Sequence, residues 1–367
     1  MAPTTHTLSE IVSQPEVWRA TLRGFAAGRP ALDRFLEQAV FEQVLAVGCG
    51  STHYLAQAAA AMLNSCTIFP ARALPSSELW LFPDTIPGEE TLLVAVSRSG
   101  TTTETLRAVE CFREVGAGPV LAVTCYPASP LAQQADFALV ATDAQEQSVA
   151  QTRSFTSMLL LTQALAATLD GDEGMLERLG RLPGALEDLV SRVGDLPQRL
   201  GEDRAIERLF FLGSGPLYGL ASEAMLKTKE MSLSYAEAYY PLEFRHGPMS
   251  MVDEHTLVVG FLSDTARAPE LRVLKDMQGL GAHTLALVED SAPSGDGVPS
   301  EDGVPSEDGV DCSDWRAEHV VELRSGLDEW ERGPLYLPLV QRLAYHRAIA
   351  KGLDPDHPTH LTAVVEL

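Results

Sequence analysis

The feature that most constrains the fold is a repeated local pattern: a short apolar run, a turn rich in Gly, Ser and Thr, and then a helical segment. The first copy has an apolar run at 41–47, the turn Gly48-Cys49-Gly50-Ser51-Thr52, and an Ala-rich segment at 54–63. The apolar run predicts a buried strand, and the Ala-rich segment predicts a helix. Strands that alternate with helices predict a mostly parallel sheet with helices on both faces.

The same order returns along most of the chain. Further buried strands are expected at 91–96, 120–124, 137–141, 208–212, 255–261, 283–287 and 319–323. Helices are expected at 7–40, 104–115, 154–169, 218–231, 269–280 and 337–351. Because the order restarts at 208, the chain is predicted to hold two tandem copies of one α/β unit, each a flavodoxin-like three-layer sandwich.

The chain is predicted to consist of five parts. They are an N-terminal helical segment at 1–30, a first unit at 31–170, linker helices at 171–205, a second unit at 206–350 and a C-terminal tail at 351–367 that closes the functional site. Within the second unit the hexapeptide GVPSED occurs twice in tandem at 297–308. Its Gly, Pro, Ser and acidic composition cannot bury a core, so a solvated, disordered insertion is expected at about 291–314. An acidic interaction tag is the alternative interpretation.

Charge and composition exclude several classes of partner. The formal net charge is −24, which disfavours binding to nucleic acid or to anionic lipid. No apolar run approaches the ~18 residues of a membrane span, and residues 1–19 lack the pattern of a secretory signal. The five cysteines are scattered without a CxxC pair, which predicts reduced thiols and no metal site. We therefore expect a cytoplasmic protein.

The segment 97–103, Ser-Arg-Ser-Gly-Thr-Thr-Thr, is the strongest chemical signal. It follows a predicted buried strand and opens a predicted helix, and five of its seven residues carry hydroxyl groups. A phosphate at such a position meets backbone N–H groups, the positive end of the helix dipole and several hydroxyls. Helix capping alone needs only one or two of these residues. No Walker A lysine and no GxGxxG spacing are present, so a nucleotide is disfavoured.

The earlier turn at 48–52 is a weaker signal, because many strand–helix turns contain Gly and Ser. Ligands of parallel sheets lie at the carboxyl ends of the strands, so both turns are expected to face one pocket. Cys49 is expected to be a small, inert buried residue, since no His or Asp spacing would activate its thiol.

A third motif lies on the predicted helix at 218–231. Glu223, Lys227 and Glu230 stand at i, i+4 and i+7 and so share one helix face. A solvated stripe of salt bridges is the ordinary explanation of such spacing. Arg245 and His246 follow shortly after, which brings acid, base and imidazole into one short stretch. A carboxylate beside two cations suits proton transfer on a sugar carbon, and an imidazole suits opening of a sugar ring.

Together these motifs resemble the sugar isomerase (SIS) domain family. The matching segments are CGSTHY, SRSGTTTET, SVAQTRSF, LKTKE, AEAYYPLEFRHGP and LAYHRAIAKGLDPDHP. The chain is similar to the isomerase half of glutamine–fructose-6-phosphate aminotransferase and to SIS-type amino-sugar-phosphate deaminases. The opening SEIVSQPEVW resembles the N-terminus of the galactosamine-phosphate deaminase/isomerase branch.

The resemblance implies a binding set and a catalytic set. The residues implied to hold the sugar phosphate or line the sugar are Thr52, Ser97, Arg98, Ser99, Thr102, Val149, Gln151 and Glu223. For catalysis, Glu230 is implied to move the proton between C1 and C2, and Lys227 to steady the enediolate charge. His246 is implied to open the ring, reaching over from the neighbouring subunit of a homodimer.

Two departures from the aminotransferase bear on the activity. Its C-terminal loop has a lysine that forms a Schiff base with the sugar, whereas Ala363 holds that place here and no lysine follows Lys351. The glutaminase half is not in this sequence, so glutamine hydrolysis is not expected of this chain.

The leading hypothesis is therefore an amino-sugar 6-phosphate deaminase/isomerase that acts on glucosamine or galactosamine 6-phosphate and needs no metal or redox cofactor. Three alternatives remain open. They are a plain aldose–ketose isomerase, an aminotransferase subunit supplied by a separate glutaminase, and a non-catalytic sugar-phosphate-binding module.

Overall fold

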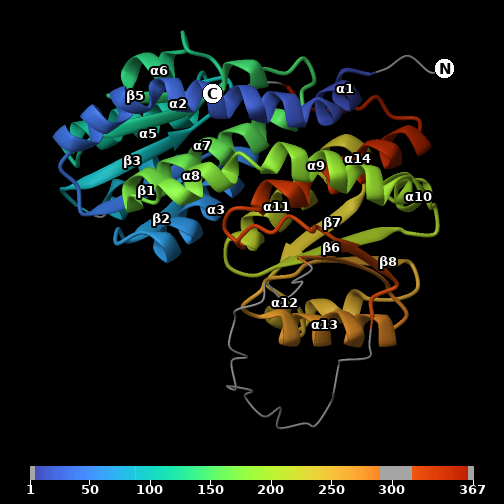
Figure 1. Ribbon diagram of the computed structural model, residues 1–367. Helices are drawn as coiled ribbons and strands as arrows, with labels where there is room; N and C mark the ends of the chain where they lie inside the picture. Colours follow the sequence, from blue (N-terminus) through green and yellow to red (C-terminus); the bar gives the residue numbers. More distant parts are fainter. Residues whose placement is uncertain (1–4, 87, 290–315, 363–367) are drawn as a thin grey trace.

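The computed structural model describes residues 5–86, 88–289 and 316–362 and contains two five-stranded parallel sheets (Figure 1). The strand order is β2-β1-β3-β4-β5 in one sheet and β7-β6-β8-β9-β10 in the other. The identical order confirms two tandem α/β units. The expected insertion at 291–314 and Ala363 lie outside the described residues.

The first unit is preceded by two helices, α1 (His6–Val12) and α2 (Gln14–Gln38). Its strands are β1 (Gln43–Gly48), β2 (Ala71–Pro75), β3 (Thr91–Val96), β4 (Val120–Thr124) and β5 (Phe137–Val140). Its helices are α3 (Ser51–Cys66), α4 (Ser76–Leu81), α5 (Thr103–Glu114), α6 (Pro130–Gln134) and α7 (Arg153–Asp170). Short 3₁₀ turns are η1 (Pro83–Thr85) and η2 (Thr142–Ala144).

Three helices then lead to the second unit: α8 (Glu173–Leu179), α9 (Leu182–Val193) and α10 (Leu196–Glu202). The second sheet is built from β6 (Arg208–Gly213), β7 (Tyr235–Tyr239), β8 (Thr256–Phe261), β9 (His283–Val288) and β10 (His319–Glu322). Its helices are α11 (Pro216–Ser232), α12 (Pro241–Phe244), α13 (Arg267–Gly279) and α14 (Leu337–Ala350), with 3₁₀ turns η3 (Pro248–Met251) and η4 (Gly333–Tyr336).

Every strand expected from the sequence is present, with its ends within two residues of the prediction. The central strands β1, β3 and β8 are buried along almost their whole length, as parallel strands covered on both faces must be. Two strands were not predicted, β2 and β7. Each pairs with a single neighbour at one edge of its sheet and carries a mixed burial pattern.

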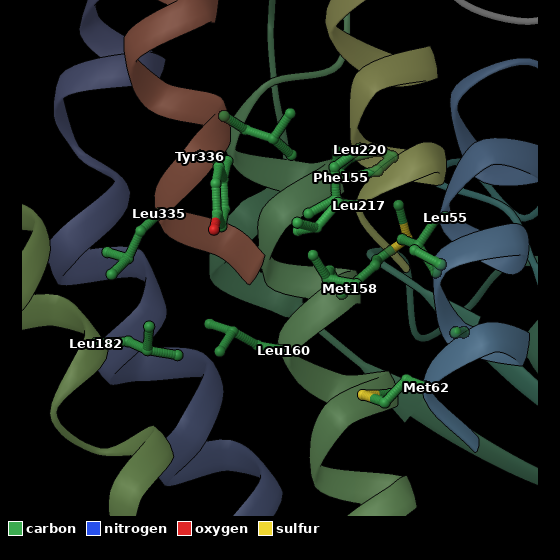
Figure 2. Packing of buried hydrophobic residues seen from close by; sticks show 14 of the residues in the cluster. Leu55, Met62, Phe155, Met158, Leu160, Leu182, Leu217, Leu220, Leu335 and Tyr336 are labelled. Carbon is green, nitrogen blue, oxygen red and sulfur yellow. The ribbon is translucent and has the colours of Figure 1, made fainter. Parts of the chain in front are cut away.

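One continuous hydrophobic cluster joins the inner faces of the two sheets. It includes Val94 of β3 and Val259 of β8, with the helices that lie between the sheets. Figure 2 shows this packing, with Leu55 of α3, Phe155 of α7 and Leu217 of α11 directed toward a shared centre. Separate clusters lie on the outer faces, under α5 in the first unit and under α12 and α13 in the second (Figure 1).

The contact between α3 and α11 brings the two units' strand–helix turns together. A Cβ atom on Gly219 of α11 would lie 2.5 Å from the carbonyl oxygen of Tyr54 and 2.8 Å from the amide nitrogen of Ala58. Only glycine therefore permits the two helix backbones to approach so closely. Among the described helices, none combines the length and the apolar character that a membrane crossing requires.

Candidate active site

The hydroxyl-rich turn at 97–103 joins β3 to α5 and is ordered by its own side chains. Ser97 Oγ lies 3.0 Å from Thr102 Oγ1 and accepts a hydrogen bond from the amide of Gly100 at 3.1 Å. Ser99 Oγ accepts from the amide of Thr101 at 3.2 Å and from its hydroxyl at 2.9 Å. The turn is therefore already shaped before any ligand binds, which lowers the entropic cost of binding.

Backbone conformation at Gly100 keeps this turn open. Its φ is +65°, and a Cβ atom there would lie 2.1 Å from Ser129 Oγ, so no other residue fits without strain. The amides of Ser99, Thr102 and Thr103 find no hydrogen-bond acceptor in the described part of the chain. Free amides beside hydroxyls at the start of a 12-residue helix form a site for an anion.

The neighbouring turn, at the start of α3, is held by Thr52. Its hydroxyl donates to the carbonyl of Cys49 at 3.0 Å and accepts from the Cys49 amide at 2.9 Å. Thr52 is 3% exposed, and its hydroxyl is engaged within its own turn. Burial raises the pKa of the Cys49 thiol, which agrees with the expectation of an inert cysteine.

Arg98 extends from the turn at 97–103, which we call the phosphate turn after the ligand expected there, toward a loop at 146–151 that is distant in the sequence. Its Nη1 donates to the carbonyl of Val149 at 2.9 Å and to that of Ser148 at 3.4 Å. The same nitrogen lies 3.6 Å from Glu146 Oε2, whose side chain is fully buried. The guanidinium group therefore ties the phosphate turn to the segment that was expected to line the sugar.

On α11 the side chains of Glu223, Lys227 and Glu230 contact one another, as their helical spacing predicted. Lys227 Nζ lies 3.5 Å from Glu223 Oε1 and donates a hydrogen bond to Glu230 Oε2. Lys227 is 1% exposed and Glu223 is fully buried, whereas the Glu230 side chain keeps 18% of its surface exposed. The stripe is therefore a buried charge cluster and not a solvated surface pattern, and Glu230 is its member that a ligand can reach.

Burial sets the protonation of this cluster. It raises the pKa of Glu223 to about 8, although the Lys227 ammonium opposes the shift. The hydroxyl of Ser51 also acts against the shift, but burial outweighs both groups. Burial also acts to lower the pKa of Lys227, but the charges of Glu223 and Glu230 outweigh it and raise that pKa. Lys227 therefore keeps its charge.

The charge cluster lies beside the first unit. The charge of Arg98 acts on Lys227, and the charges of Glu223, Lys227 and Glu230 all act on the phenol of Tyr54. Burial and then Glu223 raise the pKa of Tyr54, which keeps its hydroxyl protonated. The carboxylates of α11 are thus within electrostatic reach of the turns at 48–52 and 97–103.

The corresponding turn of the second unit, after β8, is filled by the protein's own carboxylates. Glu329 accepts from the amides of Asp264 at 2.6 Å and Thr265 at 3.4 Å. Glu270 accepts from the amide of Ser263 at 2.7 Å, from its hydroxyl at 3.1 Å, and from the hydroxyl of Ser214. Two of the protein's own carboxyl groups therefore occupy the equivalent strand end, and of the two turns, as far as the structure describes them, the one in the first unit has amides left for a ligand.

The remaining predicted residues lie in less enclosed places. Val149 and Gln151 are half-buried, and Gln151 Oε1 is a buried atom without a partner in the described residues. His246 is exposed between α12 and η3, and no interaction found at 5–86, 88–289 or 316–362 links its imidazole to Glu230 or Lys227. This chain alone therefore brings together the phosphate turn and the carboxylate–lysine set, but not His246.

Sequence reasoning missed two carboxylates that shape the site, Glu146 and Glu10. Glu146 accepts from the amide of Thr152 at 2.6 Å and from its hydroxyl at 2.7 Å, so it caps α7. Glu10 binds the same loop from α1. Both lie in or beside segments that carried the family resemblance, but nothing in their spacing shows that they meet. In the described residues no cluster of His, Cys, Asp or Glu is arranged to hold a metal ion.

The fold and the open anion turn define an α/β protein of the type that binds small phosphorylated ligands. Residues 40–168 and 204–293 match the model of the SIS domain. These two regions make up more than half of the sequence, and the chain belongs to the SIS domain family.

Relatives over the whole chain are phosphosugar enzymes. A Streptomyces coelicolor protein provisionally named D-galactosamine-6-phosphate deaminase is 31% identical, covering 96% of this chain and 91% of its own length. The glutamine–fructose-6-phosphate aminotransferase of Pseudomonas putida is 29% identical over 98% of this chain. This chain spans only 58% of that aminotransferase.

Solved structures agree with this family. Glucosamine-6-phosphate deaminase of Thermotoga maritima has a TM-score of 0.77 and 28% identity, covering 99% of this chain and 100% of its own. Tagatose-6-phosphate ketose/aldose isomerase of Escherichia coli has a TM-score of 0.81 and 26% identity, covering 98% of each chain. The family is therefore one of phosphosugar isomerases and deaminases.

Proposed function

We propose that this protein is an amino-sugar 6-phosphate deaminase/isomerase. The observation that carries the proposal is the Glu223–Lys227–Glu230 cluster of α11, within electrostatic reach of Arg98 in a turn that its own side chains already order. A non-catalytic binding module would need the turn but would gain nothing from burying a lysine between two carboxylates. The likeness to two deaminases over nearly their whole lengths supports the choice of reaction.

The proposed reaction begins with the sugar phosphate anchored at 97–103 and its ring opened by His246 of a second copy of this chain. Glu230 accepts the proton from C2 of the open-chain aldose, and the ammonium group of Lys227 stabilises the negative charge that develops on oxygen. Return of the proton to C1 leaves an imine at C2. Water adds to this imine, ammonia leaves, and a ketose 6-phosphate remains.

A direct assay tests this proposal. Purified protein is incubated with glucosamine 6-phosphate and, separately, with galactosamine 6-phosphate, and both ammonia and ketose phosphate are measured. We expect equal amounts of the two products from at least one substrate. Absence of ammonia from both substrates, and from a fructosamine-type phosphate, contradicts the proposal.

A plain aldose–ketose isomerase is the second candidate, favoured by the likeness to the tagatose-6-phosphate isomerase of Escherichia coli. The same residues would serve it, because the proton transfer from C2 to C1 is common to both reactions. Interconversion of an aldose and a ketose phosphate without ammonia release would decide for this candidate.

A further inference from the structure

Helix α1 holds a buried acid that the proposed mechanism does not use. Glu10 on α1 is 3% exposed. Its Oε1 accepts from the amide of Gln147 at 2.5 Å and from that of Ser148 at 3.4 Å, and its Oε2 accepts from the hydroxyl of Ser148. A buried carboxylate is costly unless hydrogen bonds repay it, and here all the donors come from one loop.

The same loop is held from its other side by Arg98. The guanidinium group donates to the carbonyls of Ser148 and Val149, while Glu10 accepts from the amides and the hydroxyl at 147–148. The loop thus lies between a carboxylate that binds its donors and a cation that binds its acceptors. Moving the loop would break both sets of charge-assisted bonds.

Helix α1 is itself fixed, so that Glu10 has a rigid support. Asp356 accepts from the amides of His6 at 2.9 Å and Thr7 at 2.7 Å, and from the Thr7 hydroxyl at 2.7 Å. The backbone carbonyl of Asp356 also accepts from the amide of Val149 at 3.1 Å. The chain's N-terminal helix and its C-terminal segment therefore converge on the loop at 147–149.

We infer that Glu10 is a positioning residue for the sugar: through Ser148 it fixes the loop at 147–151, and with it Arg98, Val149 and Gln151, relative to the phosphate turn. This inference rests on the proposed function, in which that loop lines the sugar. The phosphate turn at 97–103 is ordered by bonds among its own residues. Loss of Glu10 should therefore loosen the hold on the sugar while the hold on phosphate persists.

The test compares Glu10→Gln with Glu16→Gln, since Glu16 lies in the first turn of the next helix, α2, and its side chain is 71% exposed. We expect Glu10→Gln to lower kcat/KM for the sugar phosphate about tenfold or more, because hydrogen bonds to a charge are lost. Binding of inorganic phosphate should change less than about twofold, because none of the bonds that order the turn at 97–103 is removed. Glu16→Gln should match the wild type in both.

Hydrogen exchange supplies a readout that does not depend on turnover. The amides of residues 147–149 should exchange faster in Glu10→Gln than in the wild type, with exchange at 97–103 unchanged. Ser148→Ala removes one partner and leaves α1 docked, so it serves if Glu10→Gln folds poorly. The double variant should lose less than the sum of the two single losses, because both changes act on the bond between Glu10 and the Ser148 hydroxyl.

The outcomes separate this inference from the proposed function. If Glu10→Gln weakens phosphate and sugar-phosphate binding equally, in step with a loss of folded protein, Glu10 is only structural and the inference is wrong. Unchanged exchange at 147–149 also overturns it. If the wild type turns over no sugar phosphate, the proposed function fails, while exchange and sugar-phosphate binding still decide the role of Glu10.

Discussion

Lys227 lies at 1% exposure between two carboxylates of its own helix. A buried ammonium group is tolerated only when partners compensate for the water it has lost, and removal of one partner leaves the others uncompensated. The cluster is therefore sensitive in stability as well as in catalysis, and the two effects can be measured separately.

Replacement of Lys227 by Met should destabilise the protein by about 3 kcal/mol at pH 9, where Glu223 is ionised in the wild type and loses the cation in its buried site. Lys229→Met is the matched control: Lys229 is exposed, two residues further along α11, and its replacement should cost less than about 0.5 kcal/mol. Chemical denaturation measures both. Since Glu223 takes up a proton below about pH 8, the cost of Lys227→Met should shrink at pH 6, and a cost that does not fall from pH 9 to pH 6 would contradict this account.

Glu223 should make stability depend on pH. Its pKa is raised by burial to about 8 in the folded protein, against 4.5 for an ordinary glutamate. The folded state therefore binds more protons than the unfolded state between these values, and the free energy of unfolding falls as pH rises through that window. Glu223→Gln removes this contribution, so the variant should gain stability relative to the wild type from pH 5 to pH 8. Parallel stability curves would show that Glu223 is ionised throughout.

How much of the site can be predicted from the sequence depends on how far apart in the sequence the contacting residues lie. The period of the α-helix places Glu223, Lys227 and Glu230 on one face, and the structure confirms their contact. The direction of Arg98 could not be predicted, because its partner Val149 is distant in the sequence. The burial of Lys227 could not be predicted either, since the same spacing of charges occurs on solvated helices.

At the scale of elements, the crossing of α3 and α11 decides whether the two units form one site. Gly219→Ala would place a methyl group 2.5 Å from the carbonyl of Tyr54, so the helices must separate. We expect a loss of about 1–3 kcal/mol, as for other overpacked contacts, together with a lower kcat. Denaturation and the turnover assay measure the two effects.

Gly24→Ala is the control for this prediction. Gly24 lies inside α2 with open space around the position of a Cβ atom, so alanine should stabilise the protein by about 0.5–1 kcal/mol. If Gly219→Ala behaves like Gly24→Ala, the close crossing is not a constraint on the site.

Elements were predicted well where burial was uniform and poorly at the edges. Strands β3 and β8 are continuous apolar runs, and the sequence predicts both closely. β7 has the sequence YAEAY with only Ala236 buried, and Glu237 accepts from the hydroxyl of Tyr235 at 2.8 Å. Such a strand is defined by its pairing with β6 and not by a local apolar pattern.

The two units of the molecule share one topology but differ in what their amides bind at the ends of the equivalent strands β3 and β8. In the first, the amide of Gly100 donates to the Ser97 hydroxyl, and the amides of Ser99, Thr102 and Thr103 have no acceptor among the residues that the structure describes. In the second, the amides at the end of β8 are bonded to Glu270 and Glu329. A carboxylate held by backbone amides occupies the place and supplies the charge that a bound anion would. Duplication of the fold therefore does not imply duplication of the site.

This asymmetry predicts one sugar phosphate per chain. Calorimetric titration of the wild type should fit a single site, and Thr102→Ala should weaken binding about tenfold, because a hydroxyl that bonds a charged phosphate is lost. Thr265→Ala alters the corresponding turn of the second unit, where Glu329 already meets the amide, and should leave the affinity unchanged. Two equivalents bound per chain, or equal effects of the two substitutions, would mean that the carboxylates of the second unit yield to ligand. Binding of one sugar phosphate per chain, weakened by Thr102→Ala and not by Thr265→Ala, would show that Glu270 and Glu329 close the turn of the second unit.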